Sequence, residues 1–314
     1  TGTAYMKYCD VLYSGGLLNS AILSIPVEEG TDGARSFDHC TVRYSASAGV
    51  ELLGGNDNFV NGEVSNNAFV GIVYGPSAQI SDCVIDNNSG DGMYGSSFEP
   101  GEILAPTITG NTVRNNGGRA VYAGSYTVAD DITGNRGYGN EVNGIVFSGL
   151  SLDNSWSPTN MQFAGEELPY VFEGLVDLGP TLLTLQPGTV VKFMPEASLT
   201  ASALNVVGLE TQRVIFTSAN DSSVGGETIT GTSPAPGDWG HIRLFDSTAS
   251  ISECSMRYGG GEEIAEFIVD GGSPSLNNFS ISDSQTAGMF IYNSAATFSG
   301  GLIENNATGV ILDN

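Results

Sequence analysis

Two adjacent carboxylates and a distant histidine are the side chains whose types fit acid–base chemistry on a sugar. Asp130 and Asp131 stand together in "ADDITGN", and His241 follows a tryptophan in "GDWGHI". Glycoside hydrolysis needs two carboxyl groups within about 10 Å of each other. Asp131 and His241 are about 110 residues apart, which corresponds to about 25 Å in a stack of coils of about 22 residues. We therefore expect that these residues do not share one active site.

Three carboxylates flank a glycine-rich segment and are candidate ligands for calcium. They are Asp221, Glu227 and Asp238, in the stretch that begins "NDSSVGGE" and ends "PGDW". Ca²⁺ is bound by oxygen ligands, many of them carboxylates. The intervening "TITGTSPAP" adds no further carboxylate, so a solvated acidic loop is the alternative. We expect no required cofactor, and calcium is the ion for which this segment offers ligands.

Trp239 is the side chain that we consider for ligand binding. A tryptophan beside glycines can stack on a sugar ring, and it can equally cover the core where a loop is inserted. Both interpretations stay open. Arg114 and Arg119 are close in sequence, but we interpret them as solvated turn residues. His39 and His241 have no partner in the sequence, and we expect ordinary surface imidazoles.

Four cysteines occupy the same position in their segments. Cys9, Cys40, Cys83 and Cys254 stand in "YMKYCDV", "SFDHCTV", "QISDCVI" and "SISECSM". Segments without a cysteine place Gly62, Asn111, Phe279 or Gly301 in this column. A column that accepts Cys, Phe and Gly indicates core packing, because a free cysteine packs as a small hydrophobe. A disulfide between Cys9 and Cys40 stays open, since neighbouring strands lie about 4.8 Å apart. No C-x-x-C spacing supports zinc.

An Asn-Asn pair recurs along the chain before short apolar runs. It occurs in "SNNAFVGIVYG", "DNNSGDGMYG", "RNNGGRAVYAG" and "ENNATGVILDN", with first asparagines at Asn66, Asn87, Asn115 and Asn305. The first two spacings are 21 and 28 residues, and the longer one contains the insertion "SSFEPGEILAP". A repeat of about 21 to 24 residues with insertions at one place is typical of a solenoid. Asparagine tolerates left-handed backbone and its amide can bond to the next coil, so we expect tight turns joined by asparagine ladders.

The composition favours strands over helices. The chain of 314 residues has 43 glycines and 14% charged residues, and no segment keeps apolar residues at helical spacing. Short runs such as "GIVY", "VVKFM" and "VIFTS" are β-branched or aromatic and are bounded by turn residues, which is the pattern of strands. We therefore predict an all-β, parallel β-solenoid with coils of about 21 to 24 residues.

The net charge of −25, from ten Lys plus Arg against 35 Asp plus Glu, argues against nucleic acid as a partner, because phosphates require cationic side chains. The segment "GGGEEIAEF", with Glu262, Glu263 and Glu266, is expected to be an acidic surface insertion. No run of 18 apolar residues is present, so we expect no membrane span.

Four blocks in fixed order carry a resemblance to a known class. They are "LQPGTVVKF" (185–193), "VIFTSANDSSVGG" (214–226), "SPAPGDWGHIRL" (233–244) and "ISECSMRYGG" (251–260). They resemble the module common in large, secreted, multi-module bacterial surface proteins of the right-handed parallel β-helix class, which shares its architecture with pectate lyases. The resemblance implies that fold and an extracellular or cell-surface location. It implies little about activity, since many such proteins have no assigned chemistry.

The sequence departs from the patterns of enzymes with this architecture. Polygalacturonase-like hydrolases resemble one another through N-T-D, an Asp pair, G-H-G and R-I-K, and N-T-D and R-I-K are absent here. Elimination of the pectate-lyase kind would need an Arg or Lys above a calcium cluster. We therefore expect a protein that is not an enzyme. A polysaccharide-active lyase or hydrolase and a carbohydrate-binding module remain the alternatives.

A longer repeat overlies the coil repeat. "GTAYMKYCDVLYSGG" (2–16) aligns with "STASISECSMRYGGG" (247–261) without gaps, an offset of 245 residues. We expect residues 1–150 to be the later coils of one module, 151–180 a connecting segment and 181–314 the first coils of the next module. The expected function is a structural or adhesive module that forms a rod or fibre. The expected partners are further copies of the module, stacked in tandem or end to end, with a cell-surface glycan as a further candidate.

Overall fold

The computed structural model describes residues 4–14, 20–24, 34–54, 56–96, 103–124, 127–149, 160–261 and 263–313. The chain divides into two compact units, Thr1–Ile145 and Val146–Asn314. The described residues form short parallel strands joined by turns and contain no helix. The all-β solenoid fold predicted from the sequence is confirmed.

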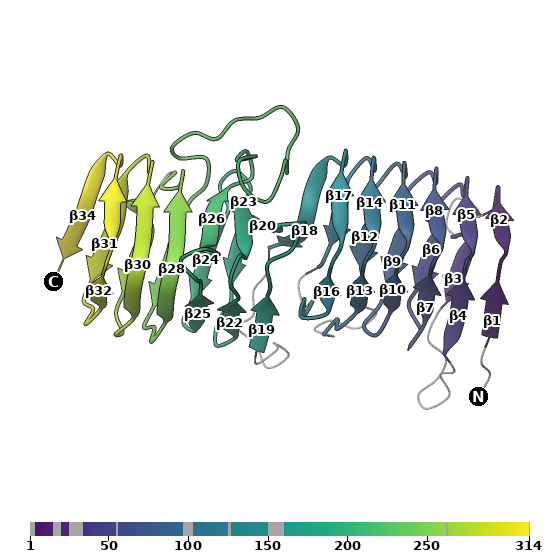
Figure 1. The fold of residues 1–314 in the computed structure, drawn as a ribbon, viewed down its shortest axis with the longest axis horizontal. Coiled ribbons are helices and arrows are strands. Elements are labelled where there is room, and N and C mark those ends of the chain that lie inside the picture. Colours follow the sequence, from purple (N-terminus) through teal and green to yellow (C-terminus); the bar gives the residue numbers. More distant parts are fainter. Residues whose placement is uncertain are drawn as a thin grey trace. The chain divides into compact units, whose positions relative to one another are not determined.

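Three parallel sheets surround the core of the first unit, and successive coils add one strand to each (Figure 1). The first sheet contains β1 (Ala4–Lys7), β4 (Arg35–Asp38), β7 (Asn58–Val60), β10 (Gln79–Ser81), β13 (Thr107–Thr109) and β16 (Ile132–Thr133). The second contains β2 (Asp10–Leu12), β5 (Thr41–Arg43), β8 (Glu63–Ser65), β11 (Val84–Asp86), β14 (Thr112–Arg114) and β17 (Arg136–Tyr138). The third contains β3 (Ile22–Ser24), β6 (Val50–Leu52), β9 (Ile72–Tyr74), β12 (Met93–Gly95) and β15 (Arg119–Tyr122). Strand β18 (Val142–Ser148) contains the point at which the chain passes to the second unit.

Single residues with left-handed backbone make the corners between these strands. The corner between the first and second sheets is at Tyr8, His39, Asn61, Asp82, Gly110 and Gly134, and the corner after the second sheet is at Tyr13, Tyr44, Asn66, Asn87, Asn115 and Gly139, all with positive φ. Gly, Asn and Asp reach this conformation at low cost, whereas other residues are strained by about 1–2 kcal/mol. The recurrence of Asn at Asn66, Asn87 and Asn115 thus follows from the turn geometry.

Alternation along each short strand places one file of apolar side chains inside the coil. In the first sheet Phe37, Phe59, Ile80, Ile108 and Ile132 follow one another in register and are buried. Because the coils stack in register, each side chain packs on its equivalent above and below. The core is therefore a continuous column.

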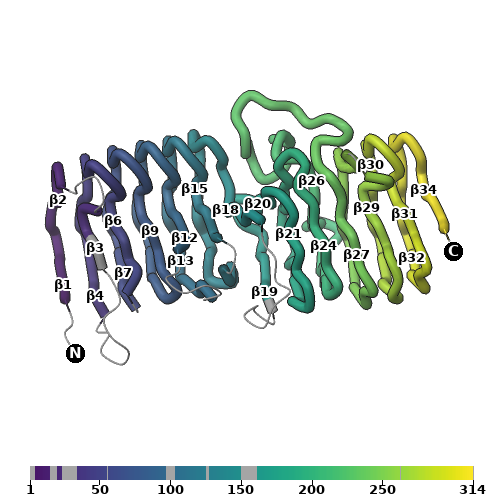
Figure 2. Tube along the Cα trace, turned by 180° about the vertical axis from the view of Figure 1, so that it is seen from behind, coloured from purple at the N-terminus to yellow at the C-terminus, as the bar shows by residue number. Residues whose placement is uncertain are grey.

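The second unit is also a stack of coils (Figure 2), and several of its strands are longer than those of the first unit. One sheet contains β21 (Leu175–Asp177), β24 (Ser198–Ala201), β27 (Ile242–Phe245), β29 (Ala265–Asp270), β31 (Ala287–Tyr292) and β34 (Thr308–Asp313). The remaining strands are β19 (Asn160–Phe163), β20 (Tyr170–Glu173), β22 (Leu182–Leu185), β23 (Val190–Phe193), β25 (Leu204–Val207), β26 (Val214–Ser218), β28 (Ser250–Arg257), β30 (Ser275–Ser282), β32 (Thr297–Ser299) and β33 (Leu302–Glu304). Strand β28 is long enough to pair with both β25 and β26.

The predicted connecting segment 151–180 lies only partly within the described residues. Its described part carries β19, β20 and β21, so residues 160–177 belong to coils of the second unit. The module boundaries at 150 and 180 stay a prediction.

Candidate functional site

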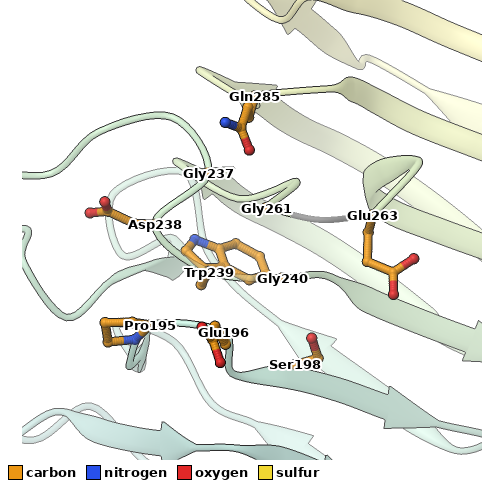
Figure 3. Close-up of a pocket in the computed structure, with 10 residues that line it drawn as sticks. All are labelled: Pro195, Glu196, Ser198, Gly237, Asp238, Trp239, Gly240, Gly261, Glu263 and Gln285. Carbon is orange, nitrogen blue, oxygen red and sulfur yellow. The ribbon is translucent and has the colours of Figure 1, made fainter.

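A pocket of about 520 Å³ opens on the wall of the second unit (Figure 3). Its lining comes from the turn before β24, the end of the loop before β27 and the turns that precede β29 and β31. The lining residues are Pro195, Glu196, Ser198, Gly237, Asp238, Trp239, Gly240, Gly261, Glu263 and Gln285. Most of them are polar or glycine, so the pocket suits a hydrated ligand better than an apolar one.

Gly240 allows the two coils beneath the pocket to approach closely. A Cβ at this position would clash with Ser198 Oγ and would displace it. The Gly240 amide donates to the Ala197 carbonyl at 2.9 Å. The glycine therefore fixes the close contact that brings Ser198 beside His241.

Ser198, His241 and Glu263 form a contact set inside this pocket region. Ser198 Oγ lies 3.4 Å from His241 Nδ1, and Glu263 Oε1 lies 3.7 Å from the same nitrogen. A catalytic relay needs the nucleophile on one ring nitrogen and the carboxylate on the other. Burial lowers the pKa of His241, Glu263 opposes this, and Arg243 adds to it. The set thus holds a neutral imidazole in place without the geometry of a Ser-His-acid triad.

Trp239 forms the floor of the pocket and is fully buried. Its ring stacks on Phe193 at 4.2 Å, and its Nε1 donates to the Arg257 carbonyl at 3.0 Å. A fully buried ring has no free face on which a sugar could stack. The ligand-binding interpretation of Trp239 stays a prediction that this burial does not favour, and the contacts are those of a residue that covers the core at the loop.

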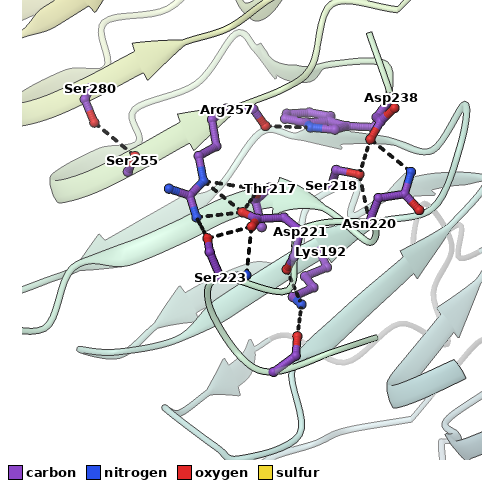
Figure 4. A network of polar contacts seen from close by, with 12 residues as sticks. Lys192, Thr217, Ser218, Asn220, Asp221, Ser223, Asp238, Ser255, Arg257 and Ser280 are labelled. Carbon is purple, nitrogen blue, oxygen red and sulfur yellow. Dashed lines mark hydrogen bonds and ion pairs between the residues drawn. The ribbon is translucent and has the colours of Figure 1, made fainter. Parts of the chain in front are cut away.

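A polar network holds the base of the loop between β26 and β27 (Figure 4). Asp221 accepts two hydrogen bonds from Arg257, at 2.6 and 2.9 Å, and further ones from Thr217 and Ser223. Lys192 Nζ donates to the carbonyls of Asp221 and Gly226 at 2.8 and 2.7 Å. The buried ammonium of Lys192 and the half-buried guanidinium of Arg257 thus anchor the start of the loop.

The ionisation of this network follows from its contacts. Burial acts to raise the pKa of Asp221, but hydrogen bonds from Ser223 and Thr217 and the charge of Arg257 lower it overall. Burial lowers the pKa of Lys192 to about 8, Asp221 opposes that shift, and Arg257 adds to it. Asp221 is thus held as a carboxylate at neutral pH.

Each of the three candidate calcium ligands accepts hydrogen bonds from a different set of protein groups. Asp238 accepts from Ser218 Oγ, Asn220 Nδ2 and the Ala235 amide, at 2.6 to 3.1 Å. Glu227 accepts from the Gly231 amide at 3.2 Å, and Asp221 is engaged by Arg257. Within the described residues, no group of three or more His, Cys, Asp or Glu side chains is placed to hold a metal ion. A calcium site at Asp221, Glu227 and Asp238 stays a prediction that these contacts do not favour.

The asparagine pairs of the first unit divide two tasks between them. The first members, Asn66, Asn87 and Asn115, take the left-handed corner, as Asn305 does in the second unit. The second members, Asn67, Asn88 and Asn116, form a buried ladder in which Nδ2 of each donates to Oδ1 of the next, and Asn140 and Asn143, which belong to no Asn-Asn pair, continue it, at 2.8 to 2.9 Å. The sequence repeat predicted a ladder, and the inner member of each pair is the residue that builds it.

A family model described as a right handed beta helix region matches residues 25–136. Together with the stacked parallel sheets, this match supports a right-handed β-helix repeat fold for the chain. Neither the curated proteins nor the solved structures gave a match to it. The described part of this β-helix protein holds no helix with the length and apolarity that a membrane crossing requires.

The cysteines of the β-helix protein lie in packing columns. Cys83 Sγ accepts from the Gly62 amide at 3.5 Å, and the Cys83 amide donates to Asn111 Oδ1 at 2.9 Å. Cys254 pairs in register with Phe279, whose ring lies where a side chain of Gly301 would be. All four cysteines are free thiols, and Cys9 and Cys40 have their Sγ atoms 3.1 Å apart.

The remaining charged candidates lie in turns or in ion pairs of the first unit and do not line the pocket. Asp130 and Asp131 are exposed in a turn. His39 takes a left-handed corner and its Nδ1 lies 2.5 Å from Asp38. Arg114 pairs with Asp86 at 3.0 Å and Arg119 with Asp91 at 3.7 Å. These pairs bridge adjacent coils, so they stabilise the stack.

Glu266 corrects the expectation of an acidic surface segment. Glu262 lies outside the described residues and Glu263 is exposed, but Glu266 is fully buried, and neither of its carboxyl oxygens meets hydrogen-bond geometry with any described residue. Burial raises the pKa of Glu266 well above its usual range; the Gly259 amide, which lies near the carboxyl without good hydrogen-bond geometry, opposes the shift, and Asp283 adds to it. No local pattern in the sequence indicates a buried carboxyl here, because only the register with Gly259 and Trp239 places it inside.

Proposed function

We propose that this β-helix is a non-catalytic structural or adhesive module of an extracellular surface protein, and that its coils form part of a longer rod. The observation that carries the proposal is the stacking of the coils in register, in which each coil supplies side-chain acceptors to the main chain of its neighbour. Beside β34, a pocket of about 410 Å³ is lined by strand residues that include Met289, Phe298, Val310 and Leu312. Leu312 is 70% exposed. A further coil of the same kind is the surface that would bury these side chains.

The hydrogen bonds of the coils indicate what such a coil would offer. In the first unit Ser45 N donates to Asn67 Oδ1, and Asn67 N donates to Asn88 Oδ1 in the next coil. In the second unit Ser284 N donates to Asn306 Oδ1 in the same way. We expect the covering coil to present a polar acceptor to Asn306, supplied by a tandem module or by another copy of the chain.

The proposal of a non-catalytic role is supported by the hydrogen bonds and ion pairs that the reactive side chains make within the protein. His241 presents the same nitrogen to Ser198 and Glu263. Asp221 is neutralised by Arg257, and Asp238 is hydrogen-bonded by its own loop. Groups held in this way stabilise the loop and the stack, and they leave little chemistry for a substrate.

Association of the purified chain tests the stacking proposal. Concentration-dependent rods in electron micrographs and in sedimentation are expected, and the double variant Val310→Asp/Leu312→Asp should remain monomeric. Leu175→Asp is the matched control, because Leu175 is an exposed apolar side chain on the first strand of the same sheet. A chain that stays monomeric at every concentration, both alone and joined in tandem to the coils of a second copy, would contradict the proposal.

A carbohydrate-binding module is the second candidate, favoured by one observation in the first unit. Tyr13 and Tyr44 are exposed and stack at 4.8 Å with their planes within 13°. Tyr44 also lines a groove of about 580 Å³ with Asn66, Asn87 and Asn115. Aromatic faces beside amides can hold neutral sugars. Titration with soluble neutral glycans, compared between the native chain and Tyr44→Ala, tests this candidate.

A further inference from the structure

Two thiols of the first unit lie against each other across adjacent coils. Cys9 Sγ and Cys40 Sγ are 3.1 Å apart, close enough for one thiol to donate to the other. Cys40 also donates to the Met6 carbonyl at 3.6 Å. Cys40 is buried and Cys9 is half-buried. One sulfur of the pair is therefore within reach of a small reagent, and the other lies behind it.

We propose that Cys9 and Cys40 are a disulfide-forming pair, which a small disulfide such as oxidised glutathione converts into a covalent link between the first two described coils.

The backbone already has the spacing that such a link needs. Lys7 pairs with Asp38 on one side of the thiols, and Asp10 pairs with Thr41 on the other. The Thr41 amide donates to the Cys9 carbonyl at 2.8 Å. In-register parallel strands lie about 4.8 Å apart, inside the Cα–Cα range of about 4.4 to 6.8 Å found for disulfides. Closing the bond therefore needs a movement of the sulfur atoms and little movement of the strands.

The exchange reaction balances with two molecules of glutathione as products. The Cys9 thiol loses a proton and its thiolate attacks one sulfur of oxidised glutathione, which breaks that S–S bond and releases one glutathione thiolate. Cys40 then loses its proton and attacks the Cys9 sulfur of the mixed disulfide, which releases the second glutathione. The two cysteines are oxidised, and the glutathione disulfide is reduced.

The surroundings of Cys9 set the pace of this reaction. Burial raises the pKa of Cys9 to about 11, and Cys40 and Asp10 add to the shift. Because the thiolate is the nucleophile, the rate should increase about tenfold for each pH unit below this value. Link formation is therefore expected to be slow at neutral pH and much faster near pH 9.

The other cysteines are internal controls. Gly62 occupies the column between Cys40 and Cys83, so these two thiols lie about two coil spacings apart, beyond the reach of a disulfide. Cys254 has Val214 and Phe279 as its neighbours in register. Among the described residues, the geometry thus selects a single pair.

Peptide mapping of the oxidised native chain tests the proposal. The chain is incubated with oxidised glutathione, quenched with acid, alkylated in denaturant and cleaved with trypsin without reduction. Cleavage after Lys7, Arg35 and Arg43 should give the fragments 8–35 and 36–43 joined by a bond that reductant breaks. Cys83 and Cys254 should be alkylated. Cys83→Ser should give the same linked pair, and Cys9→Ser should give none.

Three outcomes would overturn the inference. The first is that Cys9 carries glutathione while Cys40 stays a free thiol. The second is that all four cysteines are alkylated after prolonged exposure at high pH. The third is a link that joins Cys83 or Cys254. A parallel reaction with chain unfolded from the start should lose the preference for the Cys9–Cys40 pair, which separates the effect of the fold from that of the sequence.

Discussion

The guanidinium of Arg257 lies 2.6 Å from the carboxylate of Asp221 (Figure 4), although the two residues are 36 positions apart. Arg257 ends β28, and Asp221 follows β26 in the preceding coil. The Asp221 side chain is 2% exposed and the Arg257 side chain 24%. The pair therefore joins two coils at the point where the long loop leaves the stack.

Removal of one partner of this pair should destabilise the second unit. Arg257→Ala leaves the buried carboxylate of Asp221 without its counter-charge, and breaking such a pair costs about 3 kcal/mol. Chemical denaturation measures the loss. The double variant Arg257→Met/Asp221→Asn should recover part of it, because the carboxylate that Arg257 balanced is gone, while Lys192 keeps its hydrogen bonds to two backbone carbonyls. Equal stability of Arg257→Ala and the native chain would show that solvent replaces the guanidinium.

Glu266 gives a pH dependence with a defined sign. Its pKa in the folded state is raised well above the ordinary value of 4.5, so the folded chain binds more protons than the unfolded chain above that pH. The contribution of the neutral carboxyl to stability is complete below about pH 4.5 and is lost as pH rises toward the folded pKa. Glu266→Gln should match the native chain near pH 4.5 and exceed it near pH 8.

Denaturation curves between these pH values measure the effect of Glu266. Glu304→Gln is the control, since Glu304 is exposed, and it should leave the profile unchanged. If Glu266→Gln keeps the pH profile of the native chain, the carboxyl is reached by water or gains a partner when it ionises.

The corners and the core of this fold could be predicted from the sequence, because both depend on local patterns. A left-handed corner selects Asn66 and Asn87 whatever lies far away, and alternation alone places Phe59 inside its coil. The loop could not be predicted in the same way. Asp221 resembles a calcium ligand in the sequence, and only the stacking of coils brings Lys192 and Arg257 to it.

The burial of Trp239 and Glu266 depends on the register between coils, which the sequence alone does not reveal. In the sequence, Trp239 fits both a platform for a sugar and a cover for the core, and a glutamate in an acidic run suggests the surface. Both side chains lie at Gly259, where a Cβ would meet each of them within 3 Å. The absence of a side chain at Gly259 makes room for the ring and the buried carboxyl. That relation depends on the pairing of β28 and its neighbours, which single-segment patterns do not encode.

Incubation with polysaccharides should give no turnover. Pectate, alginate and neutral glycans, with calcium present, are expected to release neither reducing ends nor unsaturated sugars, because His241 contacts both Ser198 and Glu263 through one nitrogen. The variants Asp130→Asn and Asp131→Asn test the exposed carboxylates. If the native chain reproducibly cleaves one of these polysaccharides and either variant does not, the protein is an enzyme.

The two members of one asparagine pair should differ sharply in their contribution to stability. Asn88 is buried, its Oδ1 accepts from Asn67, and its Nδ2 donates to Asn116 and to the Val64 carbonyl. Asn88→Ala leaves several buried polar groups unpaired, each costing about 1–3 kcal/mol, so a loss on the order of 3 kcal/mol is expected.

Asn87 is the matched control, since it precedes Asn88 and has a φ of 54°. Glycine adopts this backbone freely, so Asn87→Gly should lose only the hydrogen bond from its exposed amide to Asn66 at 2.6 Å, about 0.5–1 kcal/mol. Denaturation midpoints of the two variants provide the comparison. The ladder holds neighbouring coils together only if Asn88→Ala is clearly the less stable, and equal midpoints would mean that water or a shifted rung takes over its hydrogen bonds.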